Sequence, residues 1–158
     1  RTLEGDCAFY AALRATEVDL ARLGKAWEEL HACYQNSTAH NLEEEGAADA
    51  RFHMAIAEAS HNVVLLHTLH SCYRLFENGV FLNRGRLYHH TSARAEVLKQ
   101  HKAVFEAIAA GDPKLAQRCA EEHIDYVRAT LAATEQQDQR EKLAGLRRTQ
   151  ASDRAVKK

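Results

Sequence analysis

The sequence contains little of what sheets, long loops and disulfide frameworks require. Its 158 residues include one proline and seven glycines, the two residue types that most often interrupt helices and form tight turns. Its four cysteines (Cys7, Cys33, Cys72 and Cys119) form no CxxC pair, so isolated reduced thiols are a better interpretation than disulfides. The composition therefore favours a single helical domain with short connections.

A large net charge and long apolar runs are also missing. The 21 Lys and Arg residues nearly balance 22 Asp and Glu residues, and the formal net charge is −1, so bulk charge predicts no nucleic-acid contact. No segment approaches the roughly 20 apolar residues that span a bilayer, and no secretory signal opens the chain. We therefore expect a cytoplasmic protein with no membrane contact. Because the chain begins at Arg1 without methionine, we also expect a fragment of a longer protein.

Apolar periodicity and capping signals instead predict an all-α antiparallel bundle of about six helices. Thr16 with Asp19 forms a capping pattern, Asn62 is a second N-cap, and "GDP" at 111–113 ends one helix and begins the next. The predicted helices span about 3–15, 16–34, 39–60, 62–83, 91–111 and 113–134, with a connection at 85–90. Residues 136–158 are polar and basic, and we expect a fraying helix followed by a disordered tail.

Three predicted helices turn histidines toward the core. In "DARFHMAIAEASHN", residues 49–62, Asp49 and His53 lie one helical turn apart on the face that carries apolar residues. His101 and His123 occupy the apolar stripes of the last two helices in the same way. The sequence therefore directs three imidazoles and one carboxylate toward the interior.

Two interpretations of these residues remain open from periodicity alone, because the sequence does not show that the three helices meet. A lone core histidine is usually hydrogen-bonded to a neighbour without any ligand role. Four buried polar groups, however, are costly unless they satisfy one another or a cation. Three imidazoles and a carboxylate suit a divalent metal, with zinc favoured over nickel, manganese or iron, and can leave positions open for an exogenous chelator.

Two longer segments resemble a known family. "DARFHMAIAEASHN" and "QHKAVFEAIAAGDPKLAQRCAEEHIDYV" are similar to the FCD effector-binding domain of GntR-type transcription regulators, in the FadR subfamily. The family pattern is D-x-x-x-H, a histidine that opens "H..v..AI..GD...A", and a final histidine about one helix later. Asp49, His53, His101 and His123 match this pattern. The opening "RTLEGDCAFYAALRATEVDL" is similar to the family's first helices, so the resemblance covers residues 1–135.

The resemblance implies an internal cavity with a metal at its floor, held by the four matched residues, and a small carboxylate effector. "HNVVLLHTLHSCYRLFENGVFLNRGRLYHH" is most similar to the branch that responds to glycolate, lactate and pyruvate. Arg1 matches a cavity-facing arginine of the family and is a candidate partner of the carboxylate. Tyr73 is a candidate for the cavity wall, with core packing as the alternative. The family also implies a homodimer, and it implies DNA binding only through a winged helix-turn-helix domain that this chain lacks.

Three functions fit such a site. A sensor would bind metal and acid without turnover, and this is the function we expect. A metal-dependent enzyme that activates water is the alternative, but no H-E-x-x-H motif pairs a glutamate with these histidines, and we expect no enzyme. In the third possibility, the metal only stabilises the bundle and no effector binds.

Overall fold

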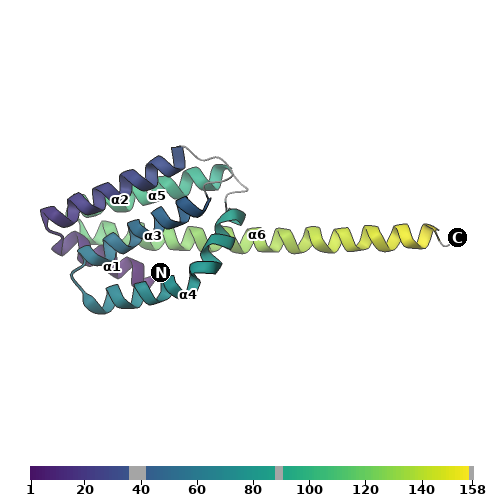
Figure 1. Ribbon diagram of the computed structural model, residues 1–158, viewed down its shortest axis with the longest axis horizontal. Helices are drawn as coiled ribbons and strands as arrows, with labels where there is room; N and C mark the ends of the chain where they lie inside the picture. The colour runs from purple at the N-terminus through teal and green to yellow at the C-terminus, as the bar shows by residue number, and fades with distance from the viewer. Residues whose placement is uncertain (36–41, 88–90, 157–158) are drawn as a thin grey trace.

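The computed structural model describes the backbone of residues 1–35, 42–87 and 91–156, and the side chains of residues 1–35, 43–75 and 93–144. The described residues form six helices and no strand (Figure 1): α1 Thr2–Arg14, α2 Glu17–Gln35, α3 Leu42–Ala59, α4 Val63–Leu87, α5 Thr91–Ala109 and α6 Pro113–Val156. This confirms the all-α fold that the composition and periodicity predict.

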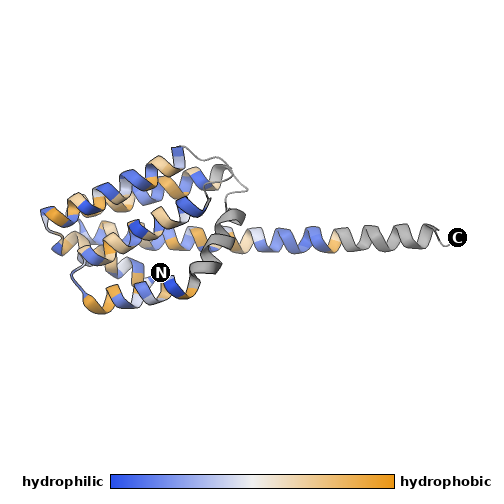
Figure 2. Ribbon diagram, viewed as in Figure 1, coloured by the Kyte–Doolittle hydropathy of each residue, from blue (hydrophilic) through white to orange (hydrophobic). Residues whose placement is uncertain are grey.

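The helices pack into one bundle, from which the second half of α6 projects as a single long helix (Figure 1). Within the bundle, α6 packs against α1 and α5, while α3 packs against α1, α2 and α4. Apolar and polar residues recur along each bundle helix (Figure 2), and the apolar ones meet in a core that contains Leu23, Leu30, Phe52 and Ile108. None of the described helices has the length and apolar character needed to cross a lipid bilayer.

The two predicted N-caps form as local hydrogen bonds. At the start of α2, the Thr16 N–H donates to Asp19 Oδ2 (2.9 Å), and the Asp19 N–H donates back to Thr16 Oγ1 (3.3 Å), which is a capping box with aspartate at its third position. At the start of α4, Asn62 Oδ1 accepts from the N–H groups of Val64 (3.1 Å) and Leu65 (3.3 Å). These bonds satisfy backbone donors that the first helical turn leaves without partners.

The junction of α5 and α6 also follows its sequence signal. Gly111 has φ +65°, the left-handed conformation that glycine adopts without a steric penalty. The N–H of Gly111 donates to Ile108 O (3.0 Å) and the N–H of Asp112 to Ala107 O (3.1 Å), the two bonds of a Schellman motif. Asp112 Oδ1 then caps α6 by accepting from the N–H of Leu115 (3.0 Å).

The predicted end of the last helix is wrong. We expected it near residue 134, but α6 continues to Val156. The expected disorder of the tail stays a prediction. The prediction of the helix end rested on polar composition, which limits burial and does not by itself stop a helix. Residues 135–144 contain neither glycine nor proline, and they are rich in Gln, Glu, Arg and Lys, which are good helix formers.

One other helix boundary is shifted. Helix α4 continues to Leu87, so residues 85–87 are helical rather than part of the expected connection. The remainder of that connection, 88–90, lies outside the described residues. The structure describes α3 from Leu42. The predicted start of this helix near residue 39 falls within 36–41, which also lie outside the described part of the chain.

Candidate metal centre

Three histidines from three helices meet inside the bundle. His53 of α3, His101 of α5 and His123 of α6 have side-chain donor atoms that all lie within 4.8 Å of one another. Their exposed fractions are 6%, 0% and 3%. The Nε2 atoms of His53 and His101 are 3.2 Å apart, and the ring centroids of His101 and His123 are 4.2 Å apart. The sequence did not show whether these three helices meet, and in the structure they do meet at these residues.

Asp49 lies at the same place. It is 4% exposed, its Oδ1 is 3.0 Å from His101 Nε2, and its Oδ2 is 3.8 Å from His53 Nε2. The one-turn spacing from Asp49 to His53 on α3 brings both side chains to one face, and packing of α5 adds His101. We call Asp49, His53, His101 and His123 the imidazole cluster.

The donor atoms of the imidazole cluster fit a divalent metal ion. Two ring nitrogens 3.2 Å apart are close to the separation of about 3.4 Å that two nitrogens on a tetrahedral zinc ion would have. Imidazole nitrogen and carboxylate oxygen are ligands for Zn²⁺, Ni²⁺, Mn²⁺ and Fe²⁺. The three imidazoles are also buried, where unbalanced polar groups are costly. The cluster therefore has the donor types, spacing and burial needed to hold such an ion.

Two further polar side chains, which the sequence analysis missed, contact the outer nitrogens of the cluster. Glu4 Oε2 of α1 lies 3.0 Å from His53 Nδ1, and Gln100 Oε1 lies 3.3 Å from His123 Nδ1. One signal for Glu4 was available, because it precedes the buried residues Cys7 and Ala8 by three and four positions and so shares their face of the helix. No comparable pattern marks Gln100.

A family model described as the FCD domain matches residues 1–126 of the chain. The chain belongs to the FCD domain family. Its relatives identify it further as an FCD domain of the FadR subfamily of GntR-type regulators. The Glc operon transcriptional activator of Escherichia coli K12 is 35% identical over 82% of the chain and 51% of its own length.

Two other relatives carry names of the same kind. An Escherichia coli K12 protein named for regulation of an L-lactate dehydrogenase operon is 34% identical over 82% of the chain and 47% of its own length. The HTH-type transcriptional regulator LutR of Bacillus subtilis is 29% identical over 84% of the chain and 58% of its own length. The FCD domain thus spans about half the length of the curated relatives that it matches.

Tyr73 and Arg1, the two remaining predicted site residues of this FCD domain, lie in different surroundings. The ring of Tyr73 is partly buried and lies 6.1 Å from the ring of His53, so Tyr73 borders the imidazole cluster. The side chain of Arg1 is 56% exposed and pairs with two carboxylates of α6, Glu121 (2.9 Å) and Asp125 (3.4 Å). As placed, the charge of Arg1 is therefore matched by α6 rather than directed at the cluster.

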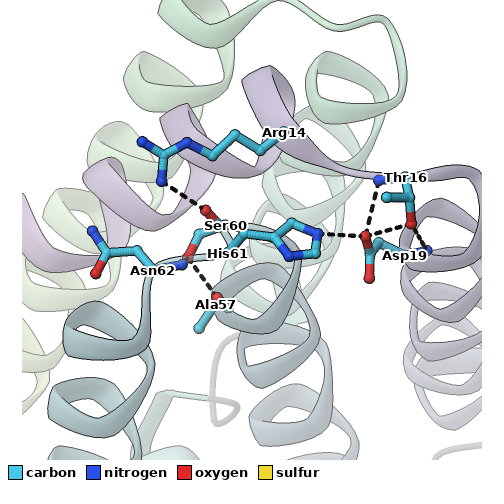
Figure 3. A network of polar contacts seen from close by, with 7 residues as sticks. All are labelled: Arg14, Thr16, Asp19, Ala57, Ser60, His61 and Asn62. Carbon is cyan, nitrogen blue, oxygen red and sulfur yellow. Dashed lines mark hydrogen bonds and ion pairs between the residues drawn. The ribbon is translucent and has the colours of Figure 1, made fainter.

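A second Asp–His contact lies between the α1–α2 and α3–α4 connections (Figure 3). His61 Nε2 is 2.8 Å from Asp19 Oδ2, and the His61 side chain is 49% exposed. The pKa of Asp19 is lowered to about 2, mainly because the Thr16 hydroxyl donates to its carboxylate, with further stabilisation from the Thr16 N–H and His61. Arg14 donates to the carbonyl of Ser60. We call these residues, together with Asn62, the turn network.

Proposed function

We propose that this chain is the effector-sensing part of a bacterial transcription regulator and that it binds one divalent metal ion through Asp49, His53, His101 and His123. Zinc is the favoured ion, with nickel, manganese and iron as alternatives. The observation that carries the proposal is the convergence of three imidazoles and a carboxylate in one buried cluster. The names of the relatives, which are regulators of operons, support the sensing role.

The effector in this proposal is a small 2-hydroxy or 2-oxo acid such as glycolate, lactate or pyruvate, held in an internal cavity beside the cluster. Such an acid offers two neighbouring oxygens that can chelate an ion. When bound, the metal supplies the positive charge that compensates the buried carboxylate of the effector. The relative named for regulation of an L-lactate dehydrogenase operon supports this ligand class.

The chain's own residues have separate roles in this site. Asp49 and the three imidazoles hold the ion, and Tyr73, beside His53, forms part of the wall and can donate its hydroxyl to the acid. Arg1 can contribute only if it exchanges Glu121 for the effector carboxylate, because the two side chains are paired at 2.9 Å. The acid is thus anchored mainly at the cluster, with Arg1 as a second, exchangeable partner.

Catalysis by the same site is not part of the proposal. A metal-dependent hydrolase needs a general base directed at the reacting water. Glu4, a carboxylate outside the ligand set, contacts the outer nitrogen of His53 instead. Glu121 is engaged by Arg1. The arrangement supports binding rather than turnover.

The proposal extends to the regulator as a whole. DNA is bound by an N-terminal domain outside this chain, in the cytoplasm, and the effector domain forms a two-fold dimer, as a regulator of a two-fold DNA site requires. Light scattering at micromolar concentration tests the dimer directly. A mass of twice 17.8 kDa is expected, and a strict monomer would contradict dimerisation through this domain.

Metal analysis and thermal melting test the site itself. Protein purified without chelator or metal-affinity resin should contain about one divalent ion per chain. Glycolate, lactate or pyruvate should then raise the melting temperature, since a ligand at a hundredfold over its Kd adds about 2.7 kcal/mol. Acetate and propionate are matched controls, because they have the carboxylate but lack the 2-hydroxy or 2-oxo oxygen.

The result with chelated protein separates two versions of the proposal. Without metal, the three acids should stabilise the protein much less. Equal binding by the metal-free and metal-loaded forms would make the ion structural and assign recognition of the acid to other residues. No response to any of these acids in metal-loaded protein would contradict the assigned ligand class.

A further inference from the structure

The contact between Glu4 and His53 joins the first helix to the imidazole cluster. Glu4 Oε2 and His53 Nδ1 are 3.0 Å apart although the residues are 49 positions apart in the sequence. Their side chains are 12% and 7% exposed, so water competes little for either group. An ionised carboxylate can only accept hydrogen bonds. The hydrogen of this contact therefore belongs to His53, which donates from Nδ1.

This assignment fixes the state of the opposite nitrogen. A neutral imidazole carries one N–H group, so a hydrogen on Nδ1 leaves a lone pair on Nε2. His53 Nε2 is the atom that lies 3.2 Å from His101 Nε2 and 3.8 Å from Asp49 Oδ2. Glu4 thus keeps the inward-facing nitrogen of His53 available as a ligand.

We propose that Glu4 is a positioning residue for metal binding, because its carboxylate holds His53 as the Nδ1–H tautomer with Nε2 directed into the imidazole cluster. The proposal rests on the metal site of the proposed function and adds to it a residue that lies outside the ligand set. A carboxylate behind a metal-bound histidine also raises the basicity of the ring and fixes its orientation.

The corresponding contact at His123 is weaker. Gln100 Oε1 is 3.3 Å from His123 Nδ1, and a neutral amide is a poorer acceptor than a carboxylate. Both acceptors favour the tautomer with its hydrogen on Nδ1. In two of the three imidazoles, this leaves the lone pair on Nε2. Removal of Glu4 should therefore have a larger effect than removal of Gln100.

The first test uses the chelated protein and does not depend on metal binding. Long-range ¹H–¹⁵N NMR of the imidazoles should show His53 as the Nδ1–H tautomer. Glu4→Ala should shift His53 toward the Nε2–H form, while Glu4→Gln should retain the Nδ1–H form, because the amide oxygen still accepts. An unchanged tautomer in Glu4→Ala would overturn the proposal.

Asp6 provides the matched control on the same helix. Its Oδ1 accepts from Gln117 Nε2 of α6 at 3.2 Å, so Asp6→Ala also removes a carboxylate that joins α1 to another helix but leaves His53 untouched. Glu4→Ala should lower the affinity for Zn²⁺, measured by competition with a chromogenic chelator, by about 10–100-fold. Asp6→Ala should leave this affinity within about twofold of the parent protein, and Glu4→Gln should recover most of the loss.

The outcomes separate this inference from the proposed function. Equal losses in Glu4→Ala and Asp6→Ala would show that α1 acts only by packing, and would overturn the role of Glu4. If the parent protein bound no Zn²⁺, the proposed function would fail, and the role of Glu4 in metal binding would fail with it. The tautomer of His53 would then still show whether Glu4 controls the ring. If Glu4→Ala did not fold, Glu4→Asp, which shortens the side chain and keeps the charge, would replace it in both measurements.

Discussion

The imidazole cluster and the turn network both contain an aspartate beside a histidine, but the two regions differ in burial and in the arrangement of their side chains. In the turn network, Asp19 receives hydrogen bonds from the hydroxyl and the N–H of Thr16 and lies 2.8 Å from His61. His61 is half exposed. The contacts of Asp19 join donors to an acceptor near solvent, and the network connects two turns (Figure 3).

In the imidazole cluster the same residue types are buried and directed at one another. Three rings and Asp49 come from three helices, and the nitrogens of His53 and His101 face each other at 3.2 Å. This contact is a hydrogen bond when one of the two nitrogens carries a hydrogen. In the tautomers that leave a lone pair on both nitrogens, a cation between them would satisfy both. An Asp–His contact by itself therefore does not indicate a metal site. Burial and the number of converging side chains distinguish the imidazole cluster, as a candidate metal site, from the turn network.

The largest expected effect comes from removing the imidazoles. A His53/His101/His123 triple alanine variant should lose its metal ion completely, because one carboxylate alone binds a transition metal weakly. His61→Asn in the turn network is the matched control, and asparagine tolerates the positive φ of 49° at that position. Elemental analysis of both proteins measures the metal content per chain and tests this prediction. Full occupancy in the triple variant would place the ligands elsewhere.

Asp49→Asn should have opposite effects on affinity and stability. Loss of the carboxylate should weaken metal binding. The loss of metal affinity in single alanine variants of His101 or His123 gives the magnitude with which this effect is compared. In chelated protein, the Asp49→Asn variant should have the same free energy of unfolding as the parent, or a value about 1 kcal/mol higher. The amide oxygen of asparagine can still accept from His101 Nε2, which lies 3.0 Å from the carboxylate, and burial of a neutral amide costs less than burial of a charge. Urea unfolding with and without metal measures both effects. A clear loss of stability in chelator would show that Asp49 has a structural role like that of Asp19.

Asp19→Asn should give the smallest effect, and one that depends on pH. The folded-state pKa of Asp19 is about 2, below its ordinary value of about 3.9. The ionised carboxylate therefore stabilises the fold above about pH 4, and this contribution disappears as the pH falls through about 2. We expect a loss of about 1 kcal/mol near neutral pH, reduced by partial solvent exposure.

The difference between Asp19→Asn and the parent isolates Asp19 and its contact with His61, because the titrating residues that do not contact Asp19 are common to both proteins. Urea unfolding at pH 5, 3.5 and 2 should show the difference shrinking toward zero. A difference that stayed constant over this range would contradict the lowered pKa of Asp19. The metal content of the variant should match that of the parent, because the turn network makes no contact with the imidazole cluster among the described residues.

Much of the fold followed from local signals in the sequence. The bonds of Thr16 with Asp19, of Asn62 with its helix, and of Gly111 and Asp112 with theirs all connect residues within five positions of each other, so residue type and spacing are sufficient to predict them. The end of α6 was not predictable in this way, because residues 135–144 contain no stop signal and their polarity indicates only exposure. Burial of the Asp49, His53, His101 and His123 side chains followed from helical periodicity.

The sequence by itself thus determined the helices, their caps and which side chains face inward, because these properties depend on neighbours along the chain. Only the tertiary structure decided that α3, α5 and α6 bring their inward histidines to one point. It also decided that Glu4, from a fourth helix, contacts the outer nitrogen of His53, while Arg1, one turn earlier, pairs with α6. The physical reason is that helix packing sets these distances, and packing depends on the fit of whole faces across separations such as the 48 residues between His53 and His101.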